Sequence, residues 1–346
     1  MASKMTVVQT AVRISTLFIL WIAFAVSGSG APSLFPISVH GKFGYVDATG
    51  RIAIEPRFND ANNFSEHLAA VKIGNQWGFI AESGEFTIPA AFDYVCDFFH
   101  SVAAVESHGK WGVIDTTGRF TTPPQFDELD CQRNDQYLSA PLNRGEHGWQ
   151  YFDTVRGEML PLRANLPYGF KEGLTTFNVT GIDISDPNGG SSFGFMAPDG
   201  KMVIPARFVD ARNFCEGLAA VKIGTKWGYI ERSGDVVIQP RYDWPGCFQE
   251  GMAAVVIGKL YGFIDKTGTM LIPPTYPDVG EFSEGLATVE LGSNGKWGYI
   301  DTAGRVVIKP QFDVAREFVN GIASVRVGDK NGYIDKTGRY IWAPTK

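Results

Sequence analysis

The sequence lacks the residue patterns on which most metal and nucleophile chemistry depends. Histidine is scarce, and no two histidines stand at the spacing of metal ligands on a helix. The four cysteines include no Cys-x-x-Cys pair. We find no Ser-His-Asp order, no phosphate-binding loop and no dinucleotide fingerprint. We therefore expect no catalytic residue, no metal ligand and no cofactor.

An excess of positive charge is also lacking. The chain has 31 Lys and Arg residues against 37 Asp and Glu residues, which leaves a formal net charge of −6. An acidic chain has no broad attraction for phosphate backbones. Nucleic acid is therefore excluded as a partner.

Long hydrophobic runs are missing as well, because the apolar run Ile14–Val26 has only 13 residues. A bilayer span needs about 20 residues. Lys4 and Arg13 lie before or at the start of this run, and small residues follow it. This layout predicts a secretory signal peptide over residues 1–30, with an uncleaved anchor as the alternative. Its removal takes two cations and no acid, so the charge of the mature chain becomes −8.

What the chain does contain is a repeat whose pivot is an aromatic residue followed by Gly. The pivots are separated by 34, 34, 38, 44, 34, 34, 36 and 34 residues, and a fixed period of this size indicates a repeat architecture. Trp149 keeps the ring without the Gly, and Asn331 keeps the Gly without the ring. The nine pivots are Phe43, Trp77, Trp111, Trp149, Phe193, Trp227, Tyr261, Trp297 and Asn331.

Other residues keep step with the pivot. A Gly follows seven residues later in most copies, and a β-branched run, a Pro and an aromatic-Asp pair come next. The sequence Lys-Trp-Gly occurs at 110–112, 226–228 and 296–298. The chain thereby resembles the bacterial WG-repeat family, also called KWG repeats, over roughly residues 34–346. The resemblance implies a scaffold with few assigned functions.

Each copy is predicted to form three antiparallel strands. In the sixth copy these are Ala219–Ile223, Trp227–Glu231 and Asp235–Ile238, with tight turns between them and Pro240 ending the third. An irregular loop of about 12 residues leads to the next copy. We expect an all-β protein, a tandem array of nine meander repeats. We favour an open or curved solenoid, and a closed toroid or propeller is the alternative.

Residues 31–346 make up this array. Copies 1–3 cover about 34–126, an irregular copy 4 covers about 127–178, and copies 5–9 cover about 179–346. The long spacing before Phe193 places extra residues in a hairpin turn, and insertions of this kind often lie on a binding face. Asp183, Asp186 and Asn188 make this turn a candidate binding loop.

The cysteines occupy similar places in the loops between strands. This phase favours the pairs Cys96–Cys131 and Cys215–Cys247 in an exported protein, with four buried free thiols as the alternative. Recurring acids such as Asp47 and Glu216 lie at turns, and we interpret them as structural.

These observations predict a non-catalytic scaffold or binding protein, exported to the periplasm, the cell surface or the medium. Its extended surface would serve protein–protein interaction with a protein or cell-envelope partner. The alternative is binding of cell wall or glycan through exposed aromatic residues. We expect a monomer with no stable membrane span after signal cleavage.

The mature protein is expected to begin between Gly28 and Ser33, because the small residues that suit signal cleavage lie there. N-terminal sequencing of the exported product measures this directly. Recovery of cytoplasmic protein that still carries Met1–Gly30 would contradict it.

Overall fold

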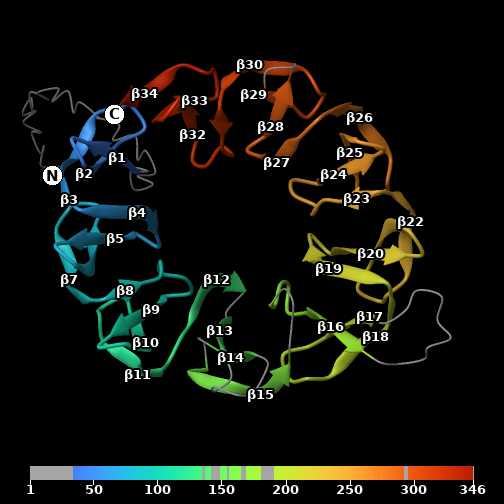
Figure 1. Ribbon diagram of the computed structural model, residues 1–346, viewed down its shortest axis with the longest axis horizontal. Coiled ribbons are helices and arrows are strands. Elements are labelled where there is room, and N and C mark those ends of the chain that lie inside the picture. Colours follow the sequence, from blue (N-terminus) through green and yellow to red (C-terminus); the bar gives the residue numbers. More distant parts are fainter. Residues whose placement is uncertain are drawn as a thin grey trace, which may run out of the picture. The chain divides into compact units, whose positions relative to one another are not determined.

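The computed structural model describes residues 34–134, 137–141, 149–153, 156–164, 169–180, 191–291 and 295–345. In these ranges the regular elements are strands, and they form nine separate antiparallel sheets in tandem (Figure 1). We number these sheets 1 to 9 in chain order. The predicted all-β array of nine meander repeats is thereby confirmed. The signal segment 1–30 and the loop residues Asp183, Asp186 and Asn188 lie outside the described residues.

Every described sheet contains the three predicted strands. The hairpin strands are β1 (Phe35–Val39), β5 (Leu68–Ile73), β9 (Val102–Ser107), β13 (Tyr137–Pro141), β16 (Thr175–Thr180), β20 (Leu218–Ile223), β24 (Met252–Ile257), β28 (Leu286–Leu291) and β32 (Ile322–Val327). The pivot strands are β2 (Lys42–Val46), β6 (Gln76–Ala81), β10 (Lys110–Asp115), β14 (Trp149–Asp153), β17 (Ser191–Met196), β21 (Lys226–Ile230), β25 (Leu260–Asp265), β29 (Lys296–Asp301) and β33 (Lys330–Asp335). The third strands are β3 (Ile52–Phe58), β7 (Phe86–Phe92), β11 (Phe120–Phe126), β15 (Glu158–Ala164), β18 (Met202–Phe208), β22 (Val236–Tyr242), β26 (Met270–Tyr276), β30 (Val306–Phe312) and β34 (Tyr340–Thr345).

The links between copies add a fourth strand, which the sequence did not predict. This link strand pairs with the hairpin strand and makes most described sheets four-stranded. The sequence predicts an irregular loop here because Pro, Asp and Gly residues hide a short pairing segment. Sheets 1 and 5 are three-stranded among the described residues. The link strands are β4 (Asp60–Ser65), β8 (Tyr94–Val95), β12 (Asp130–Asn134), β19 (Asp210–Cys215), β23 (Trp244–Pro245), β27 (Val279–Ser283) and β31 (Val314–Ala315).

The pivot Gly is needed because the third strand bulges across it. Trp227 faces Tyr242 and Tyr229 faces Ile238, so the register shifts over Gly228. A Cβ on Gly228 would lie 2.8 Å from the Pro240 nitrogen. The close neighbour is thus the backbone of the same repeat. The third strand also continues through Pro240 to Tyr242, because an edge strand tolerates a residue without N–H.

The core lies between neighbouring sheets, where aromatic rings meet in pairs. The ring two residues after a pivot contacts a Phe in the link that enters the next sheet. Tyr229 and Phe248 have centroids 5.0 Å apart, and both are almost completely buried. Such edge-on pairs add about 0.5–1.5 kcal/mol beyond the burial of area. The other pairs of this type are Tyr45–Phe64, Phe79–Phe98, Tyr151–Phe170, Phe195–Phe214, Phe263–Phe282 and Tyr299–Phe318.

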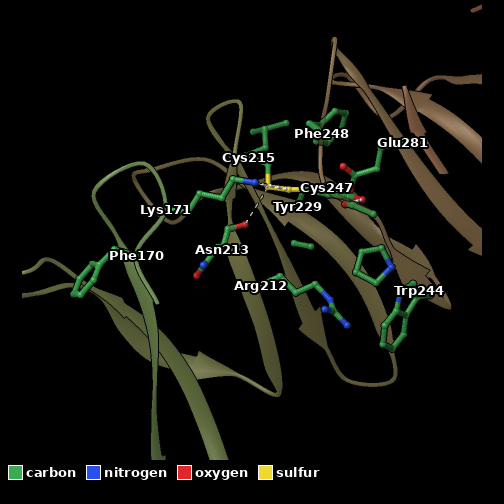
Figure 2. Close-up of a pocket in the computed structure, with 14 residues that line it drawn as sticks. Phe170, Lys171, Arg212, Asn213, Cys215, Tyr229, Trp244, Cys247, Phe248 and Glu281 are labelled. Atoms are coloured by element: carbon green, nitrogen blue, oxygen red, sulfur yellow. Dashed lines mark hydrogen bonds between the residues drawn. A yellow bond between two sulfur atoms is a disulfide. The ribbon is translucent and has the colours of Figure 1, made fainter. Parts of the chain in front are cut away.

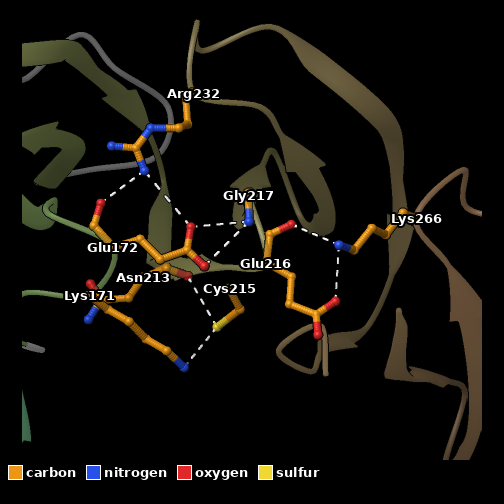
Figure 3. Close-up of polar contacts among 8 residues, drawn as sticks. All are labelled: Lys171, Glu172, Asn213, Cys215, Glu216, Gly217, Arg232 and Lys266. Carbon is orange, nitrogen blue, oxygen red and sulfur yellow. Dashed lines mark hydrogen bonds and ion pairs between the residues drawn. The ribbon is translucent and has the colours of Figure 1, made fainter. Parts of the chain in front are cut away.

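A second contact between sheets, which we call the glutamate clamp, consists of Glu66, Glu172, Glu216, Glu250 and Glu284. Each of these residues has a positive φ, which a non-Gly residue adopts only at a cost. The carboxylate of each accepts a backbone N–H from the equivalent turn of the next sheet. Figure 3 shows Glu172 with Gly217, and Glu216 with Lys266, whose Nζ is 3.0 Å from Oε2. The strained turn is thus held by its neighbour.

The first and last sheets are in contact, and we call this contact the seam. The Tyr333 hydroxyl donates to the Pro36 carbonyl at 2.7 Å, and the Tyr333 and Phe35 rings lie 5.5 Å apart. A Cβ on Gly50 would overlap the Ile341 carbonyl, just as one on Gly84 would crowd Ile54 of the preceding sheet. The array therefore closes on itself. Of the two alternatives left by the sequence, the closed arrangement is the one adopted.

Replacing Trp227 by Ala is expected to destabilise the protein by about 3–5 kcal/mol, as for other buried aromatic residues. Trp227 is only 2% exposed and belongs to a cluster shared by sheets 6 and 7. Chemical denaturation measures the loss, with Val237→Ala on the exposed edge of β22 as the control. Equal stability of the two variants would contradict a structural role for the pivot ring.

Stability is expected to fall as the pH drops from about 5 to about 3. Burial acts to raise the pKa of Glu216, but the Lys266 side chain and the Gly251 N–H outweigh it and hold the pKa below its ordinary value. Lys336 and the Gly321 N–H do the same for Glu284. A carboxyl with a depressed folded pKa stabilises the fold above its unfolded pKa and loses this contribution as the pH falls through the folded pKa.

Melting temperatures across this pH range test the clamp when wild type is compared with the double variant E216Q E284Q. The variant is expected to melt at a lower temperature at pH 7 and to lose less on acidification. An identical pH dependence in both proteins would show that these carboxylates do not carry it.

Candidate functional site

The described residues enclose a cavity of about 460 Å³ against sheets 5 to 8 (Figure 2). Its walls come mainly from the link strands β19, β23 and β27 and from the segment that precedes β16. Apart from the buried Phe that packs in the core between sheets, side chains of these link strands line the cavity. The lining includes the charged, aromatic and sulfur-containing side chains of Lys171, Arg212, Tyr229, Trp244, Cys247 and Glu281.

Trp244 and Arg212 form a stacked pair at the wall of the cavity. The guanidinium carbon of Arg212 lies 4.3 Å from the centre of the Trp244 ring and 5.5 Å from that of Trp227. Trp244 is 49% exposed, whereas Trp227 is buried beneath it. A guanidinium over an indole face is attracted by the ring quadrupole. The pair therefore presents a flat apolar surface beside a fixed positive charge.

Lys171 lies next to a disulfide at the opposite end of the cavity. The structure pairs Cys215 with Cys247 and Cys96 with Cys131, which is the pairing that the repeat phase favoured. The Lys171 Nζ lies 3.2 Å from Sγ of Cys215 and 3.5 Å from Sγ of Cys247. The bridge joins the link of sheet 6 to the link of sheet 7 and so keeps this wall in place.

The cavity combines two cationic side chains with one weakly acidic one. Burial raises the pKa of Glu281, repulsion from Glu317 raises it further, and Lys171 opposes both. Burial also holds the pKa of Tyr229 well above its usual value, and its hydroxyl donates to the Gly246 carbonyl at 2.9 Å. A neutral phenol in a structural hydrogen bond is a poor base. The arrangement is suited to binding an anionic or aromatic group.

The family of the chain is decided by its repeats. A model described as "WG containing repeat" matches residues 43–77, 77–111, 111–131, 193–227, 227–261, 261–296 and 297–330. These matches cover well over half of the sequence. The chain belongs to the WG-repeat family. No curated protein is significantly similar to it.

One solved structure resembles this WG-repeat protein in fold, and others match it more weakly. A structure titled "Crystal structure of the eukaryotic initiation factor" matches with a TM-score of 0.60 and 14% identity, over 91% of this chain and 96% of that one. Virginiamycin B lyase from Staphylococcus aureus matches with a TM-score of 0.32 and 16% identity, over 68% and 89% of the two chains. Kluyveromyces lactis Hsv2 matches with a TM-score of 0.37 and 12% identity, over 68% and 87%. The first likeness shows the fold alone, which is β-propeller-like.

The pivots of the WG repeats lie away from the cavity surface. Trp77, Trp111 and Trp227 are buried. Phe43, Phe193, Tyr261 and Trp297 are partly buried, and Asn331 is exposed. The side chain of Trp149 is outside the described residues, as is the candidate loop with Asp183, Asp186 and Asn188. Of the candidate residues that the structure describes, only Cys215 and Cys247 line the cavity.

The sequence reasoning missed Lys171, Arg212, Trp244 and Glu281, although a signal for them exists. They stand at positions of the repeat that change from copy to copy. Arg212 stands two residues before the link Phe. In the links of sheets 2, 3, 6, 7, 8 and 9 this position is occupied, in that order, by Asn62, Cys96, Arg212, Gly246, Gly280 and Arg316. A position that the framework does not constrain is available for binding, whereas the residues that repeat serve the frame.

In the described part of the chain, no three His, Cys, Asp or Glu side chains gather as a metal ion would require. No helix of the described residues is long and apolar enough to cross a membrane.

Proposed function

We propose that this WG-repeat protein is an exported, non-catalytic binding protein that holds a partner protein at the cavity around Trp244. The observation that carries the proposal is the gathering of Trp244, Arg212 and Lys171 at one concave surface. These side chains stand at variable positions of an otherwise regular frame. Trp, Tyr and Arg are also the residue types that dominate binding energy at protein interfaces.

The frame suits this role because two contacts hold it in place at the Lys171 end of the cavity. The Cys215–Cys247 bridge joins two links, and the clamp of Glu172 on Gly217 ties sheet 5 to sheet 6 (Figure 3). A preformed surface loses little conformational entropy when a partner binds. Rigid repeat arrays commonly act as binding surfaces.

Export is supported by two features. The layout of residues 1–30 is that of a signal peptide. Two disulfides are present, and such bridges persist in oxidising compartments such as the periplasm or the cell exterior.

A second candidate function is binding of a cell-wall glycan, and the exposed rings favour it. Trp244 and Tyr94 are about half exposed at the same position of the links of sheets 7 and 3. A flat exposed ring offers a platform for a sugar. The burial of Trp77, Trp111 and Trp227 argues against a continuous ladder of pivot rings as that platform.

Replacing Trp244 by Ala is expected to weaken partner binding by about 2 kcal/mol or more, as for a binding hot spot. Proteins captured from an envelope extract by the immobilised mature protein supply the partner, and its affinity is then measured by calorimetry. Tyr94→Ala is the matched control, because Tyr94 occupies the same repeat position away from the cavity.

If Trp244→Ala binds the partner as tightly as wild type and Tyr94→Ala do, the interaction lies elsewhere on the protein. Retention on purified cell-wall polysaccharide, lost in Trp244→Ala, would favour the glycan function over the protein partner.

A further inference from the structure

The regular junction between two sheets contains a two-step hydrogen-bond relay. The Tyr229 hydroxyl of sheet 6 donates to the Gly246 carbonyl, and the Gly246 N–H donates to the Ala254 carbonyl of β24 at 2.6 Å. The junction between sheets 8 and 9 repeats this pattern. There the Tyr299 hydroxyl donates to Arg316, whose N–H donates to Ser324 at 2.9 Å. The residue in the middle belongs to the link segment in both junctions.

Among the described residues, the seam has no middle residue in this relay. Pro36 faces Tyr45 in the register of sheet 1, as Ala254 faces Phe263 and Ser324 faces Tyr333. Pro36 is therefore the equivalent of Ala254 and Ser324. The Tyr333 hydroxyl reaches its carbonyl directly, and burial raises the pKa of Tyr333 to about 12, so the hydroxyl remains a donor. Phe35 of β1 likewise contacts the Tyr333 ring, and in regular junctions a link Phe makes the corresponding contact.

A second residue of β1, Ser38, directs its backbone N–H and C=O to the side where a link segment lies in other sheets. In sheets 7 and 9 the link segment also donates to the residue that faces the pivot. The Asp243 N–H donates to Val256, and the Asp313 N–H donates to Arg326 at 2.8 Å. Ser38 faces the pivot Phe43 and is their equivalent. Because the N–H and C=O of one residue in an antiparallel strand point to the same side, those of Ser38 point away from β2.

Within the described residues, β1 is the edge of its sheet, and a cavity of about 710 Å³ lies beside it. Pro36, Ile37 and Ser38 form one wall. The opposite wall belongs to sheet 9, where the pivot is Asn331 and contributes no ring. Two arginines and one acid line the cavity, together with apolar rings. The side chains that would meet a ligand are Phe43, Arg316, Arg326, Asp329, Tyr333 and Trp342.

We propose that the edge of β1 is a strand-addition site that takes an extended peptide segment of a partner protein. The segment completes sheet 1 as its fourth strand and pairs with the Ser38 backbone, as link strands do in the other four-stranded sheets. An apolar side chain of the segment packs near Phe43 and Trp342, and an acidic side chain faces Arg316 and Arg326. This site lies in other sheets than the cavity of Trp244 and does not rest on the function proposed there.

The test uses the mature protein and a labelled synthetic peptide with the sequence of residues 312–318, Phe-Asp-Val-Ala-Arg-Glu-Phe, which includes the link strand of sheet 9. Saturable binding by fluorescence anisotropy is expected. Ser38→Pro is expected to weaken it about tenfold or more, because it removes the outward N–H while an edge strand tolerates Pro. Ser38→Ala, which keeps the backbone groups, is the matched control and should bind as wild type does.

A second variant, Asn331→Trp, fills the cavity with the pivot ring and should also lose binding while its melting temperature is maintained. Hydrogen exchange adds a separate readout, because the Ser38 amide should gain protection only when peptide is present. The proposal is overturned if the peptide does not bind or binds Ser38→Pro and wild type equally. It is also overturned if the Ser38 amide of the full chain is protected from exchange without peptide. Such protection would come from the residues that precede β1 in the same chain or from a second copy of the protein, which sedimentation would detect.

Discussion

The packing of an aromatic ring from one sheet against a Phe of the next, which occurs at most junctions, is the contact on which this fold depends. A sheet of three or four short strands cannot cover its own apolar faces, so its stability comes from its neighbours. Phe79–Phe98, Tyr229–Phe248 and Phe263–Phe282 have centroids 4.7 to 5.0 Å apart, and each pair bridges two sheets. The near-constant distance between these ring centroids explains why the repeats are so regularly spaced along the chain.

The polar contacts of the junctions serve the same packing. The hydroxyl of Tyr229 and the carboxylate of Glu216 bond to backbone groups of the next sheet, so they set its position without depending on its side chains. The residue types at positions such as those of Arg212 and Trp244 are then not set by the frame. A regular scaffold with a locally irregular surface follows from this division, and it is the physical basis for assigning a binding role to the protein.

The seam shows what happens where the repeat is incomplete. Sheet 1 contributes Phe35 and Pro36 from its hairpin strand to contacts that a link segment makes elsewhere. Asn331 stands where other copies place a ring. Among the described residues, closure thus uses fewer groups than a regular junction does, and a cavity lies beside β1, which is the edge strand of sheet 1 there.

The sequence by itself determined the number of copies, their three common strands, the turns and the cysteine pairing, because all of these follow from a local period and its phase. It did not reveal the link strands, since two residues such as Trp244-Pro245 pair only when the hairpin strand is beside them. It also did not show that Gly228 makes room for its own third strand, because the bulge depends on the register of that strand. The cavity residues come from separate links, and only packing brings Lys171 to the bridge between Cys215 and Cys247. Closure was decided by the tertiary structure alone. A repeat encodes contacts between successive copies, whereas the meeting of the last copy with the first depends on the rotation that accumulates from sheet to sheet.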